Sequence, residues 1–263
     1  GQADWPTFGR DAAGTRYSTL KQIDTKNVSK LQRAWTYKMR EGQGGRVWEN
    51  SPIVVGGVMY VTTAGSKVVA LDPEKGTELW SYEVKGGQPA QRGLEYWAGD
   101  KQSPSSVFFG TSDGRLIALN AKTGQPVPGF GKEGFVDLTS GVQNGIANAP
   151  FGLDSPPIVY KSVVITGAHV QEGPSLGASG DTRAWDIHTG KLVWKNEHVA
   201  DYIHEHGPAR PLRCLPWRPT RMWPWRSRTA PAPPRRCVVG LRSPGAERMG
   251  TMPLCASSAS LDT

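Results

Sequence analysis

Histidine and glutamate side chains gather near residue 200, where they could bind a metal ion. The group is His198, His204, Glu205 and His206. Alternate side chains of a β-strand share a face, so the rings of His204 and His206 would point the same way and could bind Zn²⁺ or Ni²⁺. The competing interpretation is that the reading frame of the gene fails in this stretch, and we favour it.

A second set of reactive side chains is spread over the first 172 residues. Arg92 could bind a carboxylate through two parallel hydrogen bonds, but local pattern favours a loop arginine that pairs with Glu95. Glu49 reads locally as an exposed acid before a strand. Ser155 reads locally as part of an Asp-Ser-Pro-Pro strand start. Local pattern therefore favours a structural role for Arg92 and Ser155, and leaves a structural and a binding role equally open for Glu49.

The basic character of the chain lies in its last fifth. The whole sequence has 31 Lys and Arg against 23 Asp and Glu, a net charge of +8, and residues 208–263, rich in Arg and Pro, account for all of it. Proline at this density excludes helix interiors and central strands. The Arg-Trp-Pro runs could form an RNA-binding arm, but the composition is typical of a GC-rich gene translated out of frame. We predict that residues 201–263 are a tail, out of frame or disordered, whose start lies between Lys195 and Gly207.

Residues 1–200 repeat a unit of strand, tight turn and strand. Three turns begin with Asp or Asn and have Gly four residues later, at 72–76, 120–124 and 186–190. The short polar side chain can bond to its own backbone, and glycine permits a positive φ. A tryptophan follows eight residues after the aspartate in the first and third copies, at Trp80 and Trp194, whereas the second copy has Pro128.

Short β-branched runs come before each turn and predict hairpins, at 52–55 with 58–63, 106–111 with 115–119, and 157–159 with 162–166. No window keeps helical spacing over more than two turns. Units that recur every 45–65 residues or so are typical of propeller blades with four antiparallel strands. We therefore predict an all-β partial β-propeller in which each repeat tryptophan packs against the next blade. A sandwich is the alternative, although it would not need the repeat.

Several motifs resemble the quinoprotein alcohol and glucose dehydrogenases, which use pyrroloquinoline quinone (PQQ). They lie, in the family's order, at residues 4–10, 14–18, 48–52, 91–93, 113–120 and 155–157. The resemblance covers about residues 1–194 and implies roughly half of an eight-bladed propeller, three to four blades. No pair of adjacent cysteines lies near Gln91, which makes the chain similar to the sugar or polyol branch rather than the methanol branch.

This resemblance implies roles in binding PQQ, whose carboxylates need cations and hydroxyl donors. Arg92 matches the family's arginine that binds a cofactor carboxylate, and Glu49 matches its glutamate at the cofactor edge. Ser155 matches a hydroxyl donor. Asp154 stands where the family usually has threonine, and His169 could lie near the same pocket.

The resemblance also implies a Ca²⁺ ion, which takes oxygen ligands and would polarise the quinone carbonyl. Glu172 matches the family's metal-binding acid or its neighbour, and Gln171 could add a carbonyl oxygen. In the family a substrate alcohol gives hydride to the quinone and a proton to an aspartate. That aspartate belongs to later blades, so we assign no catalytic base.

By resemblance we expect a PQQ-dependent dehydrogenase that acts on a CH–OH group of an alcohol or sugar. The implied electron acceptor is a quinone or cytochrome, and the implied location is the periplasm. The resemblance is also compatible with membrane association of the full-length protein. We expect a chain cut short and inactive alone, because missing blades leave strand edges open. The alternative is a cofactor-free propeller that binds proteins through its loops. A nucleic-acid partner, suggested only by the tail, is not expected.

Overall fold

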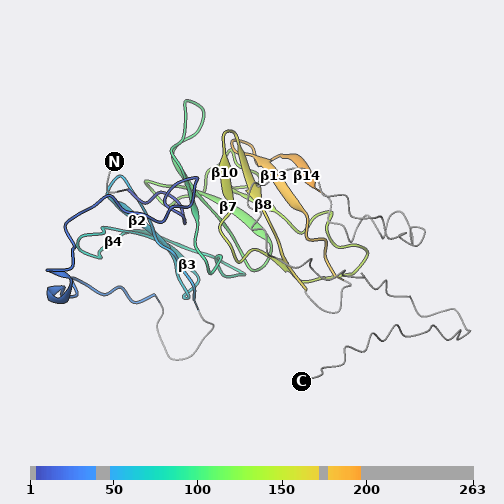
Figure 1. Cartoon of the computed structure of the whole chain (residues 1–263). Helices are drawn as coiled ribbons and strands as arrows, with labels where there is room; N and C mark the ends of the chain where they lie inside the picture. The colour runs from blue at the N-terminus through green and yellow to red at the C-terminus, as the bar shows by residue number, and fades with distance from the viewer. Residues whose placement is uncertain (1–3, 40–47, 172–176, 197–263) are drawn as a thin grey trace, which may run out of the picture. The chain divides into compact units, whose positions relative to one another are not determined.

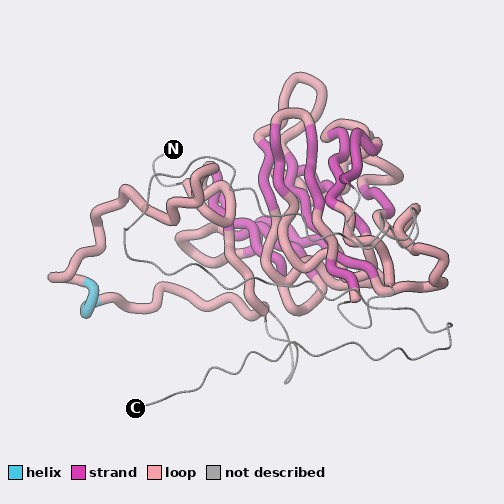
Figure 2. The backbone as a smooth tube through the Cα atoms, turned by 45° about the vertical axis from the view of Figure 1, so that its right-hand side comes forward, coloured by secondary structure: helices cyan, strands magenta, loops and turns pink. Residues whose placement is uncertain are grey.

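The computed structural model describes residues 4–39, 48–171 and 177–196. Every described residue belongs to one compact unit. The predicted tail at 201–263 and the histidine cluster at 198–206 lie outside the described residues. The single helix of the described part is the short 3₁₀ turn η1 (Val28–Lys30), drawn in cyan in Figure 2. No helix there is both long and apolar enough to cross a membrane.

Three four-stranded antiparallel sheets follow one another along the chain, and Figure 1 labels strands of each. The first contains β1 (Ile53–Val55), β2 (Val58–Thr62), β3 (Lys67–Leu71) and β4 (Glu78–Glu83). The second contains β5 (Glu95–Trp97), β6 (Ser106–Gly110), β7 (Arg115–Asn120) and β8 (Phe135–Asp137). The third contains β10 (Ile158–Tyr160), β11 (Val163–Thr166), β13 (Thr182–Asp186) and β14 (Leu192–Asn196). A separate two-stranded ladder pairs β9 (Phe151–Gly152) with β12 (His169–Val170).

Within each sheet the strands lie side by side in chain order, as in the blades of a propeller. The three predicted hairpins are confirmed as β1–β2, β6–β7 and β10–β11. The predicted turns are confirmed as well. Gly76, Gly124 and Gly190 have φ values of 68°, 70° and 67°. Each first residue of the turn accepts two backbone N–H groups through its side-chain oxygen. Local chemistry therefore fixes these turns.

Tryptophan joins the first sheet to the second. Trp80 in β4 donates its indole N–H to the carbonyl of Ala121 at 2.9 Å. A Cβ built on Gly124 would lie only 2.5 Å from Trp80 Cε3, so glycine is required beneath the ring. The predicted packing of Trp80 on the next blade is confirmed. Trp194 on β14 is 42 % exposed, and its predicted packing on a further blade has no counterpart among the described residues.

Trp35 makes the same kind of contact with the turn of the first sheet, although the sequence repeat did not include it. Its indole N–H donates to the carbonyl of Pro73 at 3.0 Å. A Cβ on Gly76 would lie 2.4 Å from the ring. The docking motif therefore extends to a segment that comes before the first sheet.

Apolar clusters fill the spaces between neighbouring sheets. One cluster includes Tyr60 of the first sheet and Phe109 of the second. Another includes Phe108 of the second sheet and Trp185 of the third. Phe108 and Phe109 are adjacent in β6, and consecutive strand residues point to opposite faces. The second sheet is thus packed on both faces, as a blade inside a propeller must be.

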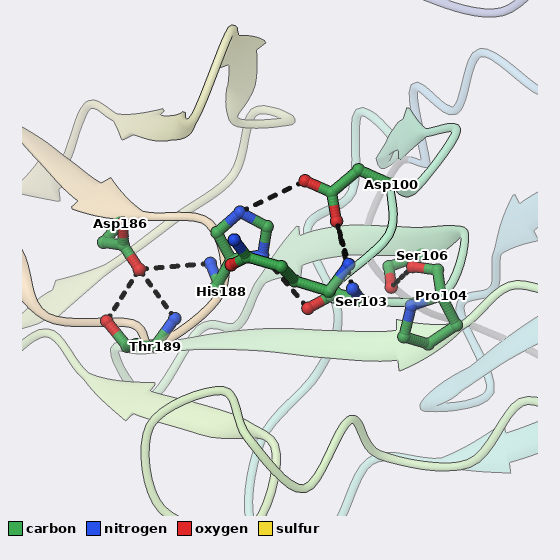
Figure 3. Close-up of polar contacts among 8 residues, drawn as sticks. Asp100, Ser103, Pro104, Ser106, Asp186, His188 and Thr189 are labelled. Carbon is green, nitrogen blue, oxygen red and sulfur yellow. Dashed lines mark hydrogen bonds and ion pairs between the residues drawn. The ribbon is translucent and has the colours of Figure 1, made fainter.

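A histidine closes the joint between the second and third sheets, where Pro128 replaces the repeat tryptophan. His188 lies in the turn between β13 and β14. Its Nε2 lies 3.3 Å from Asp100 Oδ2, and its Nδ1 hydrogen bonds with Ser103 Oγ at 3.1 Å, as Figure 3 shows. Asp100 and Ser103 belong to the loop between β5 and β6. A side-chain hydrogen bond and a histidine–carboxylate contact thus link these sheets where the indole is missing.

Candidate functional site

The loop segments that lead toward three successive sheets bring their polar side chains together. Glu49 comes before β1, Arg92 before β5 and Ser155 before β10. Arg92 Nε donates to Glu49 Oε2 at 2.9 Å, and Arg92 Nη1 donates to Ser155 Oγ at 3.4 Å. The side chains of Arg92 and Glu49 are 49 % and 52 % exposed. The guanidinium is therefore accessible to a ligand while it is held between two partners.

Asp154 and His169 adjoin this group. The backbone N–H of Arg92 donates to the carbonyl of Asp154 at 3.0 Å. The carboxylate of Asp154 is mostly buried and lies 3.0 Å from His169 Nδ1. The β9–β12 ladder pairs His169 with Gly152 and so places the imidazole beside this loop. The structure thus links all five residues that the resemblance assigned to the cofactor.

The local alternative for Arg92, an ion pair with Glu95, is wrong. Glu95 lies in β5, and its Oε2 accepts the hydroxyl hydrogen of Thr7 at 2.9 Å. Burial raises the pKa of Glu95 to about 7, although the Thr7 hydrogen bond opposes the shift. This carboxyl belongs to the contact of the N-terminal segment with the second sheet and not to the Arg92 group.

Close approach of two backbones holds the Glu49 and Arg92 segments together. Gly93 has a φ of +119°, and a Cβ there would lie 3.1 Å from the carbonyl oxygen of Ser51. A residue with a side chain would be strained in this conformation and crowded against that oxygen. The glycine of the Gln-Arg-Gly motif is therefore a structural part of the site, and the motif itself is the signal that marks it.

Two buried hydrogen-bond acceptors without partners lie next to the residues of the Arg92–Glu49 ion pair in sequence. Asn50 Oδ1 and Gln91 Oε1 are inaccessible to solvent and have no hydrogen-bond donor among the described residues. Asn50 follows Glu49, and Gln91 precedes Arg92. Such atoms are rare in native proteins and are commonly satisfied by ordered water or a bound molecule.

This donor set fits a flat ligand that carries carboxylates. The guanidinium and the Ser155 hydroxyl can both donate to a carboxylate, and Arg92 is accessible enough to receive one. Only one of the two residues that the resemblance assigned to calcium lies among the described residues. Gln171 directly follows β12, whereas Glu172 lies outside the described residues. Among the residues that the structure does describe, no three His, Cys, Asp or Glu side chains form a cluster able to hold a metal ion.

Comparison with known proteins identifies relatives of the chain. The family model "Glucose/ethanol/alcohol dehydrogenase, beta-propeller domain" of the PQQ proteins matches residues 5–225. The dehydrogenase subunit of a quinone alcohol dehydrogenase from Gluconobacter oxydans is 40 % identical over an alignment of 201 residues that covers 73 % of this chain and 24 % of that protein. Quinoprotein glucose dehydrogenase A from Acinetobacter calcoaceticus is 34 % identical over an alignment of 221 residues that covers 73 % of this chain and 28 % of that protein.

A solved structure agrees with these matches. The quinohemoprotein alcohol dehydrogenase from Comamonas testosteroni superimposes with a TM-score of 0.59 at 34 % identity, covering 74 % of this chain and 27 % of that one. The chain spans about a quarter of the length of the curated relatives it matches. The predicted family and the predicted all-β propeller class are confirmed. The chain belongs to the β-propeller family of PQQ-dependent glucose, ethanol and alcohol dehydrogenases.

Proposed function

We propose that this chain forms part of the PQQ pocket of a quinoprotein dehydrogenase that oxidises an alcohol or a sugar. The observation that carries the proposal is that Glu49 and Ser155, from two other segments, both contact the accessible guanidinium of Arg92. The family membership supports the same cofactor. When bound, PQQ supplies the two-electron acceptor that the side chains of a protein lack.

The residues of the chain bind and orient the cofactor in this proposal. Arg92 neutralises a carboxylate and Ser155 donates a second hydrogen bond to it. Glu49 holds Arg92 Nε, so the Nη groups keep a fixed direction. The carbonyl of Asp154 holds the Arg92 backbone, and His169 Nδ1 lies 3.0 Å from the buried Asp154 carboxylate and holds it in place.

Further parts of the proposal go beyond the pocket. Glu172 and Gln171 would provide oxygen ligands for Ca²⁺. The full-length protein would act in the periplasm, pass its electrons to a quinone or cytochrome, and associate with a membrane if its other segments provide for it. We assign no catalytic base among the described residues.

Titration of the purified 263-residue chain with PQQ, with and without Ca²⁺, tests the proposal. Binding is followed by isothermal calorimetry and by the absorbance of the quinone. Loss of a hydrogen bond to a charged group is worth about 1.5–3 kcal/mol, so Arg92→Gln should weaken binding roughly 10- to 100-fold. The control Arg33→Gln removes an exposed arginine outside the site and should bind as wild type does.

Two results would contradict the proposal. Equal PQQ affinity for Arg92→Gln and Arg33→Gln would remove Arg92 from the pocket. A folded wild-type chain that binds no PQQ with or without Ca²⁺ would favour the second function, a cofactor-free propeller that binds proteins through its loops.

A further inference from the structure

A buried threonine at the end of β2 contacts both segments that carry the ion pair. Thr62 is fully buried, with 0 % exposure. Its backbone carbonyl accepts the indole N–H of Trp48 at 3.0 Å and also the side-chain amide N–H of Asn50. Trp48 and Asn50 are the two neighbours of Glu49. The end of β2 therefore holds the Glu49 segment on both sides of the glutamate.

The hydroxyl of Thr62 holds the other segment. Thr62 Oγ1 donates to the carbonyl of Ala90 at 2.8 Å, and Ala90 is itself fully buried. The same carbonyl accepts the N–H of Gly93 at 3.3 Å, which closes a turn over residues 90–93. Arg92 is the third residue of this turn. The Ala90 N–H donates to Gly110 of β6 at 2.8 Å, so the turn is fixed between the first and second sheets.

We infer that Thr62 is a positioning residue that fixes Glu49 and Arg92 relative to each other, and its part in cofactor binding rests on the proposed function. One residue anchors one segment through its carbonyl and the other through its hydroxyl. The hydroxyl contact is the part that a side-chain substitution can remove. A buried carbonyl that loses its shorter hydrogen bond is left with the longer one to Gly93, and the turn that carries Arg92 loosens.

Thr62→Val tests the inference, because valine has nearly the same shape as threonine and lacks the hydroxyl. Thr62→Ser restores the hydroxyl without the methyl group. Ser106→Ala is the matched control. Ser106 is 1 % exposed and donates one hydrogen bond to a backbone carbonyl, that of Pro104, at 2.9 Å. Ser106 begins β6 and Gly110, which contacts the turn, ends it. Loss of the Ser106 hydroxyl should therefore not affect residues 90–93.

Two readouts are compared on the full chain. Amide hydrogen exchange of the peptide over residues 88–94 reports the mobility of the turn without any ligand. Titration with PQQ reports the cofactor affinity. Thr62→Val should speed exchange in residues 88–94 at least about fivefold and weaken PQQ binding by a similar factor. Thr62→Ser should restore both values, and Ser106→Ala should change neither.

Several outcomes would overturn the inference. Unchanged exchange over 88–94 in folded Thr62→Val would show that the hydroxyl does not hold the turn. Equally faster amide exchange across the whole chain, or the same effect from Ser106→Ala, would mean that Thr62 contributes only to general stability. Faster exchange over 88–94 with unchanged PQQ affinity would separate the turn from the site. If wild type binds no PQQ while Thr62→Val still loosens residues 88–94 alone, the proposed function fails and the positioning of Arg92 stands.

Discussion

Gly124→Ala places a methyl group where the Trp80 indole packs on the next sheet. The built Cβ lies 2.5 Å from Cε3 and 2.6 Å from Cδ2 of the ring. Those distances are far below van der Waals contact, so the indole has to move. Gly56→Ala is the matched control, because Gly56 also has a positive φ, +57°, but no atom lies within 4 Å of its Cβ.

The structure separates the two contributions to the loss of stability. An alanine at positive φ costs about 1–2 kcal/mol, partly offset by the lower entropy of the unfolded chain. Gly56→Ala should therefore lose about 1 kcal/mol. Displacement of the indole adds the cost of losing two contacts. These are the hydrogen bond to the Ala121 carbonyl and the aromatic contact with Tyr60, whose ring centroid is 6.0 Å away. Gly124→Ala should thus lose about 3 kcal/mol.

Urea unfolding followed by far-ultraviolet circular dichroism measures both variants. A difference below about 0.5 kcal/mol between Gly124→Ala and Gly56→Ala would refute the docking argument. A double-mutant cycle with Trp80→Ala tests the cause, because removal of the indole should leave Gly124→Ala close to the cost of Gly56→Ala. Additive losses in that cycle would mean that the clash does not involve Trp80.

Two other perturbations are expected to have measurable effects. Glu95 has a pKa of about 7 in the folded chain against an ordinary 4.5, so the folded state retains a proton that the unfolded state has lost, and stability falls as the pH rises from about 4.5 to 7. Glu95→Gln should remove this loss and stabilise the chain at pH 8, by roughly 3 kcal/mol at most because Glu95 is only partly buried. Urea unfolding at pH 5 and pH 8 measures the free energy of unfolding of both proteins. An equal decline in the two would contradict the assignment of the pH dependence to Glu95. His188→Ala should lose about 1–2 kcal/mol in the same assay, because the Asp100 carboxylate loses its contact with the imidazole and the Ser103 hydroxyl loses its hydrogen bond to it. An unchanged midpoint would mean that these two contacts do not stabilise the joint.

Local chemistry explains why the turns and hairpins could be predicted from the sequence. Asp72 bonds to the backbone of its own turn, and Gly76 supplies the positive φ four residues later. Both requirements are written in consecutive residues. The packing of Trp80 on the next sheet was also predictable, because the same spacing recurs and an indole needs a large apolar contact.

The site was predictable only through the family resemblance. Arg92 is 43 residues from Glu49 and 63 from Ser155 in sequence, and no local pattern encodes contacts over such distances. The local pattern favoured a pair of Arg92 with Glu95, which the structure pairs with Thr7 instead. The burial that decides the partner of a charged residue is a property of the assembled sheets.

Two structural residues escaped the sequence interpretation for a related reason. Thr62 ends an ordinary β-branched run, and nothing in that run distinguishes its hydroxyl from that of Thr63. Trp35 lies before the first complete repeat, so the spacing rule did not reach it. In both cases the partner, Ala90 or Pro73, identifies the role.

The charged ends of the site are carried by loops, and this divides the chain into parts with different tolerance to change. Apolar strand residues can exchange for others of similar volume as long as the sheets keep their spacing. A slide of one sheet by about 1 Å against its neighbour would separate the Arg92 guanidinium from the Ser155 hydroxyl, whose contact is already 3.4 Å long. Substitutions deep in the strands would then affect the site by shifting Arg92 relative to Ser155, without any change to the polar residues themselves.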